Sequence, residues 1–596
     1  MLSRSFLPDS EKGKMLAYTP MFHARLFAET QKYRDTHYQA TREPLTEVVP
    51  DPAPAPWLDG NPAIDRPLFV QFCANDPKYL LAAAKIVAPY CDAVDLNLGC
   101  PQGIAKKGHY GSFLQEDQDL IYRLINTLHE NLDVPVTAKI RILETKEATL
   151  AYAQNVLRAG ASILTVHGRR REQKGHITGL ADWQMIRYLR DNLPPETVLF
   201  ANGNILQHGD LERCLAATGA DAVMSAEGNL SDPAIFATPP PPGQEGREYW
   251  RPADGRGGWR VDAVFRRYLD ILHRYVFDAE PPARRPLFMP GDDVSWLEEE
   301  PKPTTTEQQQ QQPPPQAQAQ QEEDGPPRKK QKPNGNSSSK SSQQQTQNNN
   351  NKKKDDSISR SPNMVGLQGH LFHMLRHFVT RHTDVRDMLA KARLGDISTF
   401  EAILEQVERK VARGLLDYQR TNGQSILDEW ARDEEEARKK RERQEEAARK
   451  IREAKQQNGA AAAATTPTKP AAAEQKRTEE AAEEEDDDPE SSVRAVKECK
   501  RPWWVIQPIV RPLPKEALAK GAIQLKGKEG KQSQKTPRSE RGEKYKERVR
   551  QATDYVVHKV IDPKETVLKL KDGSAAKEKI EAERLQKQQN GEEQGV

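Results

Sequence analysis

Short apolar runs alternate with amphipathic segments over the first 235 residues of the chain. The runs are rich in β-branched residues, which is typical of buried strands. They lie at 15–19, 68–72, 93–98, 134–142, 162–167, 198–202 and 221–226. Apolar residues at helical spacing fill several of the intervals, for example 79–90, 120–132 and 149–160. This alternation predicts an α/β fold with a parallel sheet, and the number of units favours a TIM-type (β/α)8 barrel over 15–235.

The strand pattern leaves the predicted barrel incomplete. Seven strands can be identified, whereas a closed barrel of this type has eight. Residues 1–14 form an atypical N-terminus that offers neither a strand nor a covering helix. We therefore expect the first strand to be missing, which would leave two unpaired edges and an opened core.

The second half of the chain alternates between helical patterns and low-complexity tracts. An amphipathic pattern at 361–420 predicts a small helical domain, with one apolar face formed by Met364, Leu367, Leu371, Leu375 and Phe378. Tracts poor in apolar surface are expected to be disordered. The predicted divisions are a connector with a helix (236–278), disorder (279–360), the helical domain (361–420), a charged helix (421–457), disorder (458–500), a docking segment with Trp503 and Trp504 (501–525) and a charged, mostly disordered tail (526–596).

Composition narrows the class of protein. The net charge of +2 arises from offsetting acidic and basic runs, so it says little about partners. No apolar stretch approaches the roughly 20 residues of a membrane span, and the N-terminus has no secretory signal pattern. Five cysteines without close pairs argue against a disulfide framework or a zinc site. We expect an intracellular monomer that binds neither membrane nor metal.

Polar residues follow most of the predicted strands. The carboxyl ends of barrel strands form the open, reactive face. The residues there are Gln71, Asn97, Cys100, Lys139, Arg141, His167, Arg169, Asn202-Gly203-Asn204 and Ala226-Glu227-Gly228. Lys139 lies in an apolar strand and must reach a charge partner or solvent. Gln71 and Asn97 could instead satisfy backbone groups, Asn97 in the turn at 97–101, and His167 could be a core histidine.

Cys100 differs from the other cysteines of the barrel. Cys73, Cys91 and Cys214 lie in apolar or helical patterns and are predicted to be core residues. Cys100 stands between Gly99 and Pro101, where a strand gives way to a glycine-rich loop that would present the thiol to the open face. A metal site would need further ligands nearby. A nucleophile would need a base, for which His109 is the local candidate. The residues alone leave a nucleophile or an acid open.

Several motifs in order resemble the tRNA-dihydrouridine synthase family, in particular its eukaryotic branch acting on uridines 16 and 17 of the D-loop. They are DLNLGCPQGIAKKGHYGSFL (95–114), VQFCANDP (70–77), VTAKIRI (136–142), TVHGRRREQKG (165–175), FANGNI (200–205) and VMSAEGNL (223–230). The resemblance implies an FMN-dependent enzyme that reduces the C5–C6 bond of uracil in tRNA with electrons from NADPH. It implies that Cys100 is the general acid that protonates C5.

The same resemblance implies roles for the other residues of the open face. The FMN-binding set would be Gln71, Lys139, His167, Asn202, Gly203, Asn204, Ala226 and Glu227. The substrate-binding set would be Asn97, Arg141, Arg169, Lys106 and Lys107. Residues 102–112 would close over a flipped-out base. Relatives begin with a strand that carries an Ala/Gly-Pro-Met motif, which is not found here, so we expect protein starting at Met1 to be poorly soluble and colourless.

Two other functions stay open at this point. One is a flavin oxidoreductase acting on a small pyrimidine, and the other is a catalytically inactive tRNA-binding protein that lacks the first barrel unit. Histidines 370, 373, 377 and 382 lie in a basic segment that favours an RNA-facing or solvated surface over a metal site. A basic cluster at 328–332 resembles a nuclear import signal. Cytoplasm, nucleus or both are therefore expected.

Overall fold

The fold is taken from a computed structural model of the chain. It describes residues 1–175, 178–252, 257–298, 361–393, 395–459, 495–496 and 499–510. The basic cluster at 328–332, the predicted tail at 526–596 and most of the two predicted disordered tracts lie outside the described residues.

A parallel sheet forms the centre of the N-terminal part. Its strands are β1 (Ala17–Tyr18), β2 (Phe22–His23), β3 (Leu68–Cys73), β4 (Ala93–Leu98), β5 (Val136–Arg141), β6 (Ile163–His167), β7 (Val198–Asn202) and β8 (Ala222–Met224). The strand order is β1-β3-β4-β5-β6-β7-β8, and β2 also pairs with β3. Every predicted strand overlaps an observed one. The curled parallel sheet with surrounding helices confirms a fold of the TIM-barrel type.

The two ends of the sheet are not joined in the part of the chain that the structure describes. Because β1 and β2 both pair with β3, the sheet has seven strand positions, and β8 does not pair with β1. Curling still brings β1 and β6 together inside, where the Tyr18 hydroxyl lies 3.4 Å from Thr165 Oγ1. Residues 1–14 contain no strand, as predicted, and form two short helical turns, Ser3–Phe6 and Asp9–Lys12.

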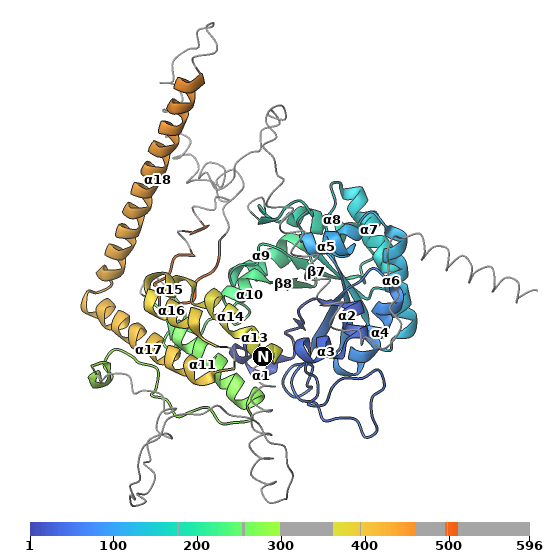
Figure 1. Ribbon diagram of the computed structural model, residues 1–596, viewed down its shortest axis with the longest axis horizontal. Helices are drawn as coiled ribbons and strands as arrows, with labels where there is room; N and C mark the ends of the chain where they lie inside the picture. The colour runs from blue at the N-terminus through green and yellow to red at the C-terminus, as the bar shows by residue number, and fades with distance from the viewer. Residues whose placement is uncertain are drawn as a thin grey trace, which may run out of the picture. The chain divides into compact units, whose positions relative to one another are not determined.

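Helices cover the outer face of the sheet (Figure 1). They are α2 (Ala24–Glu29), α3 (Gln31–His37), α4 (Pro77–Val87), α6 (Gln118–Asn131), α7 (Lys146–Arg158), α8 (Trp183–Asn192) and α9 (Gly209–Thr218). The side chains of Asp76, Asp117, Thr145 and Asp182 accept hydrogen bonds from the first-turn N–H groups of α4, α6, α7 and α8. These caps fix where each helix begins, and hence the length of each loop after the preceding strand.

A second group of helices follows. It contains α11 (Val261–Ile271), which continues as a π-helical turn (Leu272–Val276), and α13 (Pro362–Val365), α14 (Leu367–Met374), α15 (Arg376–Arg381), α16 (Thr383–Lys391), α17 (Ile397–Arg420) and α18 (Gln424–Gly459). The predicted apolar face is confirmed, because Met364, Leu367, Leu371, Leu375 and Phe378 are all fully buried. Within the described ranges, no helix combines the length and apolar composition needed to cross a membrane.

Residues 279–298 are packed against the helices, so the prediction that disorder starts at 279 is wrong for this segment. Phe288 and Leu297 are buried in the same apolar cluster as residues of α11 and α17, and Leu287 is buried as well. The carbonyl of Phe288 accepts a hydrogen bond from buried Arg260, 2.7 Å away. The proline- and charge-rich composition concealed these apolar anchors, which supply the burial that offsets chain entropy.

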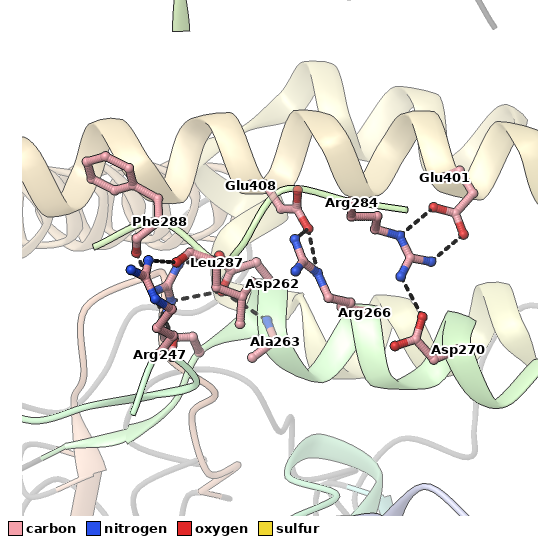
Figure 2. A network of polar contacts seen from close by, with 11 residues as sticks. Arg247, Asp262, Ala263, Arg266, Asp270, Arg284, Leu287, Phe288, Glu401 and Glu408 are labelled. Carbon is pink, nitrogen blue, oxygen red and sulfur yellow. Dashed lines mark hydrogen bonds and ion pairs between the residues drawn. The ribbon is translucent and has the colours of Figure 1, made fainter. Parts of the chain in front are cut away.

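Ion pairs join this segment to α11 and α17 (Figure 2). Arg284 donates to both carboxylate oxygens of Glu401 on α17, at 2.6 and 2.9 Å, and also to Asp270 on α11. Arg266 on α11 pairs with Glu408 on α17. Burial raises the pKa of Glu408 to about 7, although the charge of Arg266 opposes that shift. The pairs fix the relative register of the two helices.

The paired tryptophans dock inside the same molecule. Trp504 is 1% exposed, and its carbonyl accepts a hydrogen bond from the N–H of Val261 at the start of α11. Trp503 lies against Phe378 and His382, with ring centroids 5.6 and 4.6 Å away. Of the predicted docking segment (501–525) the structure describes residues 501–510, and there both tryptophans pack against the helical group.

Replacing Gly414 tests this packing. A Cβ on Gly414 of α17 would lie 2.6 Å from Trp503 Cζ2 and 2.9 Å from Trp504 Cε3. Gly→Ala inside a helix normally stabilises by about 1 kcal/mol, but overlap with two buried rings should make Gly414→Ala destabilising by about 1–3 kcal/mol. Urea unfolding followed by tryptophan fluorescence measures the change. Gly369→Ala on α14, where a Cβ meets nothing within 4 Å, is the control and should not lower the midpoint; equal midpoints for both variants would contradict the packing.

Candidate active site

The predicted site residues of five neighbouring strands lie at one end of the sheet, where the strands reach their carboxyl ends. This end is called the polar edge below. Parallel pairing sets Asn97 beside Lys139, Arg141 beside His167, and His167 beside Asn202. Gln71 is in register with Asp95 on the next strand. These residues stand at or near the carboxyl ends of β3 to β7, so the structure brings together the set that the sequence placed there.

The side-chain amide of Asn97 holds the turn that carries Cys100. Asn97 Oδ1 accepts hydrogen bonds from the N–H groups of Gly99 and Cys100, at 3.0 and 2.9 Å. Asn97 Nδ2 donates to Gln71 Oε1 at 2.7 Å. The turn-holding role considered for Asn97 is therefore what the structure shows. Its contact with a uracil stays a prediction.

The loop after Cys100 folds over that residue. It contains α5 (Gly103–Gly108) and a 3₁₀ turn (Gly111–Leu114). The N–H and the hydroxyl of Ser112 both donate to the Cys100 carbonyl, at 3.1 and 3.0 Å. Cys100 is partly exposed, whereas Cys73, Cys91 and Cys214 are buried, as predicted. The side chain of Cys100 is thus the accessible thiol among these four.

Basic side chains hold the same loop. Arg141 Nε donates to the carbonyl of Gly99 at 2.7 Å, and Lys174 Nζ donates to that of Pro101 at 2.8 Å. Lys106 and Lys107 lie exposed on α5. Of the four cationic residues predicted to meet substrate, Arg141 positions the loop and Lys106 and Lys107 face solvent, while Arg169 contacts His167 and Asn204.

Lys139 reaches a neutral acceptor. Its Nζ donates to Asn202 Oδ1 at 2.9 Å, and Asn202 Nδ2 donates to the carbonyl of Met224 at 2.8 Å. Burial, assisted by the charge of Arg141, lowers the pKa of Lys139 to about 8. The expected charge partner or solvent is replaced by an amide, and the ammonium group stays charged near neutral pH.

Arg169 connects the ends of β6 and β7. Its Nη1 lies 3.1 Å from His167 Nε2, and its Nη2 donates to Asn204 Oδ1 at 2.7 Å. Burial and the neighbouring cations lower the pKa of His167, so its imidazole is neutral. Gly203 has a φ of 114°, and a Cβ there would lie 2.6 Å from the Cβ of Ala181. The turn after β7 therefore requires glycine.

The residues after β8 complete the edge. Ala226 and Glu227 lie at the start of the short helix α10 (Glu227–Ser231). Ser225, just before them, donates from its hydroxyl to the carbonyl of Ile205 at 2.9 Å. This bond places Ala226 and Glu227 next to the loop that follows β7, and their contact with FMN stays a prediction.

Sequence reasoning missed two features of this site. Asp95 and Thr137 point into the interior beneath the edge, and Asp95 accepts hydrogen bonds from Thr137 Oγ1 at 2.6 Å and Gln71 Nε2 at 2.8 Å. Burial raises the pKa of Asp95 to about 6. Tyr110 and Cys73 form a small buried cluster that packs against Cys100. A polar residue in the middle of an apolar strand was the signal that could have revealed Asp95.

The four histidines of the helical segment divide into two kinds. His370 Nδ1 lies 2.8 Å from the Tyr268 hydroxyl, and the ring of His382 packs against Trp503. His373 and His377 are exposed. The RNA-facing or solvated surface expected for all four is therefore wrong for His382. In the described ranges no group of three or more His, Cys, Asp or Glu side chains could hold a metal ion.

The fold is an α/β fold of the TIM-barrel type with polar side chains gathered at the carboxyl ends of its strands, and sequence comparison gives its family. The sequence model described as "Dihydrouridine synthase (Dus)" matches residues 4–248. An uncharacterised tRNA-dihydrouridine synthase-like protein of Caenorhabditis elegans is 30% identical over 225 residues, which cover 37% of this chain and 70% of that protein. The chain belongs to the dihydrouridine synthase family.

Two fungal relatives are more similar in sequence. The tRNA-dihydrouridine(16/17) synthase [NAD(P)(+)] of Saccharomyces cerevisiae is 59% identical over 261 residues, covering 44% of this chain and 55% of the relative. The Schizosaccharomyces pombe protein of the same name is 49% identical over 284 residues, covering 47% of this chain and 64% of the relative. The chain thus spans somewhat more than half the length of these two curated relatives.

Gly111 provides a test of the loop geometry. Its φ is 64°, and a Cβ there would lie 2.8 Å from the Cys100 carbonyl oxygen and 3.0 Å from the Cys100 Cβ. Gly111→Ala should cost about 1–2 kcal/mol from the left-handed backbone, plus the steric overlap. Thermal unfolding measures the loss. Gly103→Ala on α5, where a Cβ meets nothing within 4 Å, should be near neutral. Equal stability of the two variants would show that the loop does not fold over Cys100 in this way.

Proposed function

We propose that the protein is an oxidoreductase that reduces uridines 16 and 17 of the tRNA D-loop to 5,6-dihydrouridine. The observation that carries the proposal is the 59% identity over 261 residues to a relative whose name states this activity; the family model matches residues 4–248, which include Cys100 and the polar edge of the sheet. We further propose FMN as cofactor, NADPH as electron donor, a monomeric state, and action in the cytoplasm, the nucleus or both.

The donor set at the edge fits a flavin mononucleotide. Lys139, Arg141 and Arg169 bring positive charge together there, while the amide of Gln71 offers both a donor and an acceptor. Positive charge binds a phosphate, and placed hydrogen-bond donors and acceptors bind a polar heterocycle. On the proposal, Gln71, Lys139 and His167 hold the ring system, and residues 202–204 with 226–227 hold the ribityl phosphate.

When bound, FMN supplies the hydride for C6 of the uracil. On the proposal, Cys100 supplies the proton for C5 as general acid. Asn97 and Arg141 hold the turn that presents this thiol. Arg169, Lys106 and Lys107 add positive charge that attracts the RNA backbone in a salt-dependent way.

Replacing Cys100 tests the reaction. Cells whose only dihydrouridine synthase for positions 16 and 17 is this chain should contain dihydrouridine there, measured by mass spectrometry of purified tRNA. Cys100→Ala removes the general acid and should lower turnover by about 10²–10⁴-fold. Cys214→Ala, which removes a buried thiol on α9, should retain activity.

Three outcomes would overturn the proposal in different ways. Wild-type turnover retained by Cys100→Ala would exclude the proposed acid. Tight tRNA binding without dihydrouridine from either protein would indicate an inactive tRNA-binding protein. Reduction of a free pyrimidine with no binding of tRNA would indicate a small-molecule flavin oxidoreductase.

The pKa of Lys139 predicts how FMN affinity depends on pH. The group is charged below about pH 8 and neutral above it, so its attraction for the anionic cofactor is fully present below that pH and declines as the pH rises. FMN titrations between about pH 6.5 and 9.5, followed by flavin fluorescence, should show weaker binding above about pH 8. Lys139→Gln should bind more weakly at low pH and lose this dependence. An unchanged dependence in Lys139→Gln would contradict the assignment.

A further inference from the structure

A network of five hydrogen bonds links a buried carboxylate to the turn that carries Cys100. Thr137 Oγ1 donates to Asp95 Oδ1 at 2.6 Å, and Gln71 Nε2 donates to Asp95 Oδ2 at 2.8 Å. Asn97 Nδ2 then donates to Gln71 Oε1 at 2.7 Å. Asn97 Oδ1 accepts from the N–H groups of Gly99 and Cys100 at 3.0 and 2.9 Å. The chain of bonds crosses three neighbouring strands, β3, β4 and β5.

The direction of every bond follows from its two ends. An ionised carboxylate only accepts hydrogen bonds, and a backbone N–H only donates. Gln71 must therefore turn its NH₂ group toward Asp95, which leaves its oxygen for Asn97. Asn97 must turn its own NH₂ group toward Gln71, which leaves its oxygen for the turn. An amide otherwise fits either way round in nearly the same volume.

Bulk water does not reach the Asp95 end of this hydrogen-bond network. Asp95 and Thr137 are fully buried, and Gln71 is 8% exposed. A buried polar group that loses its partner stays unsatisfied. The arrangement is therefore held by protein groups, and its direction is fixed by Asp95 at one end and by the N–H groups of Gly99 and Cys100 at the other.

We propose that Asp95 is a positioning residue, which fixes the orientation of the Gln71 and Asn97 amides and thereby holds the turn that presents the Cys100 thiol. The catalytic meaning of this role rests on the proposed function, whereas the effect on the turn does not. Asp95 acts through Asn97 and touches neither cofactor nor substrate in this scheme.

Asp95→Asn tests the proposal with little change of shape. An asparagine can face Gln71 with its own NH₂ group, so both amides downstream can reverse and release the N–H groups of the turn. Alkylation of Cys100 by iodoacetamide in the full-length protein, followed by mass spectrometry, should become about threefold faster or more, as expected for a locally opened segment. For tRNA reduction, kcat should fall about 10- to 100-fold with the KM for tRNA nearly unchanged.

Asp92→Asn is the matched control. Asp92 lies one residue before β4, at the amino-terminal end of the strands. It accepts hydrogen bonds from the N–H of Leu68 and from Arg66. It should leave the alkylation rate of Cys100 and kcat within about twofold of the wild-type values. Thermal unfolding shows whether both variants are folded.

A second variant keeps the test valid if Asp95→Asn does not fold. Thr137→Val removes the hydroxyl donor to Asp95 and should change the alkylation rate in the same direction, to a smaller extent. Wild-type alkylation and kcat in a folded Asp95→Asn protein would overturn the inference. Faster alkylation in that variant, in a protein whose wild-type form makes no dihydrouridine, would leave the positioning role standing and refute the proposed function alone.

Discussion

The place of the Cys100 sulfur depends on how β4 ends. The strand gives way to a turn whose first two N–H groups have no partner in the sheet, and Asn97 accepts hydrogen bonds from both. Ser112 binds the Cys100 carbonyl from the other side, and Arg141 binds the carbonyl of Gly99. A reactive side chain on a turn is positioned well only when the backbone beneath it is held. Here that backbone is held from three different segments.

Charge is distributed unevenly around this turn. Lys139, Arg141 and Arg169 place three cations at one edge of the sheet, and Asp95 lies in the buried interior below them. Burial lowers the pKa of Lys139 and raises that of Asp95, so both groups are moved toward neutral pH. Such shifts are common where an anionic ligand and proton chemistry meet. The same edge therefore combines attraction for an anion with a fixed thiol.

The strands and most of the edge could be predicted from the sequence because two rules operate there. Buried parallel strands read as apolar β-branched runs, and their carboxyl ends carry the polar residues, as Gln71, Asn97 and Lys139 do. The turn-holding bonds of Asn97 were one of the two roles considered for it, whereas the bond from Arg141 to the carbonyl of Gly99 could not be predicted, since it depends on the path of the chain around Cys100. Order in 279–298 was missed because Phe288 lies among prolines and charged residues in the sequence, and only packing in the apolar cluster of α11 and α17 buries it.

Amide hydrogen exchange at Gly99 and Cys100 tests the central claim most directly. Both N–H groups are bonded to Asn97 Oδ1, so in the full-length protein they should exchange on the order of a hundredfold or more slowly than in an unstructured peptide. Exchange at nearly the rate of the peptide, in a protein whose sheet amides are protected, would show that Asn97 does not hold the turn and that Cys100 is not fixed as described.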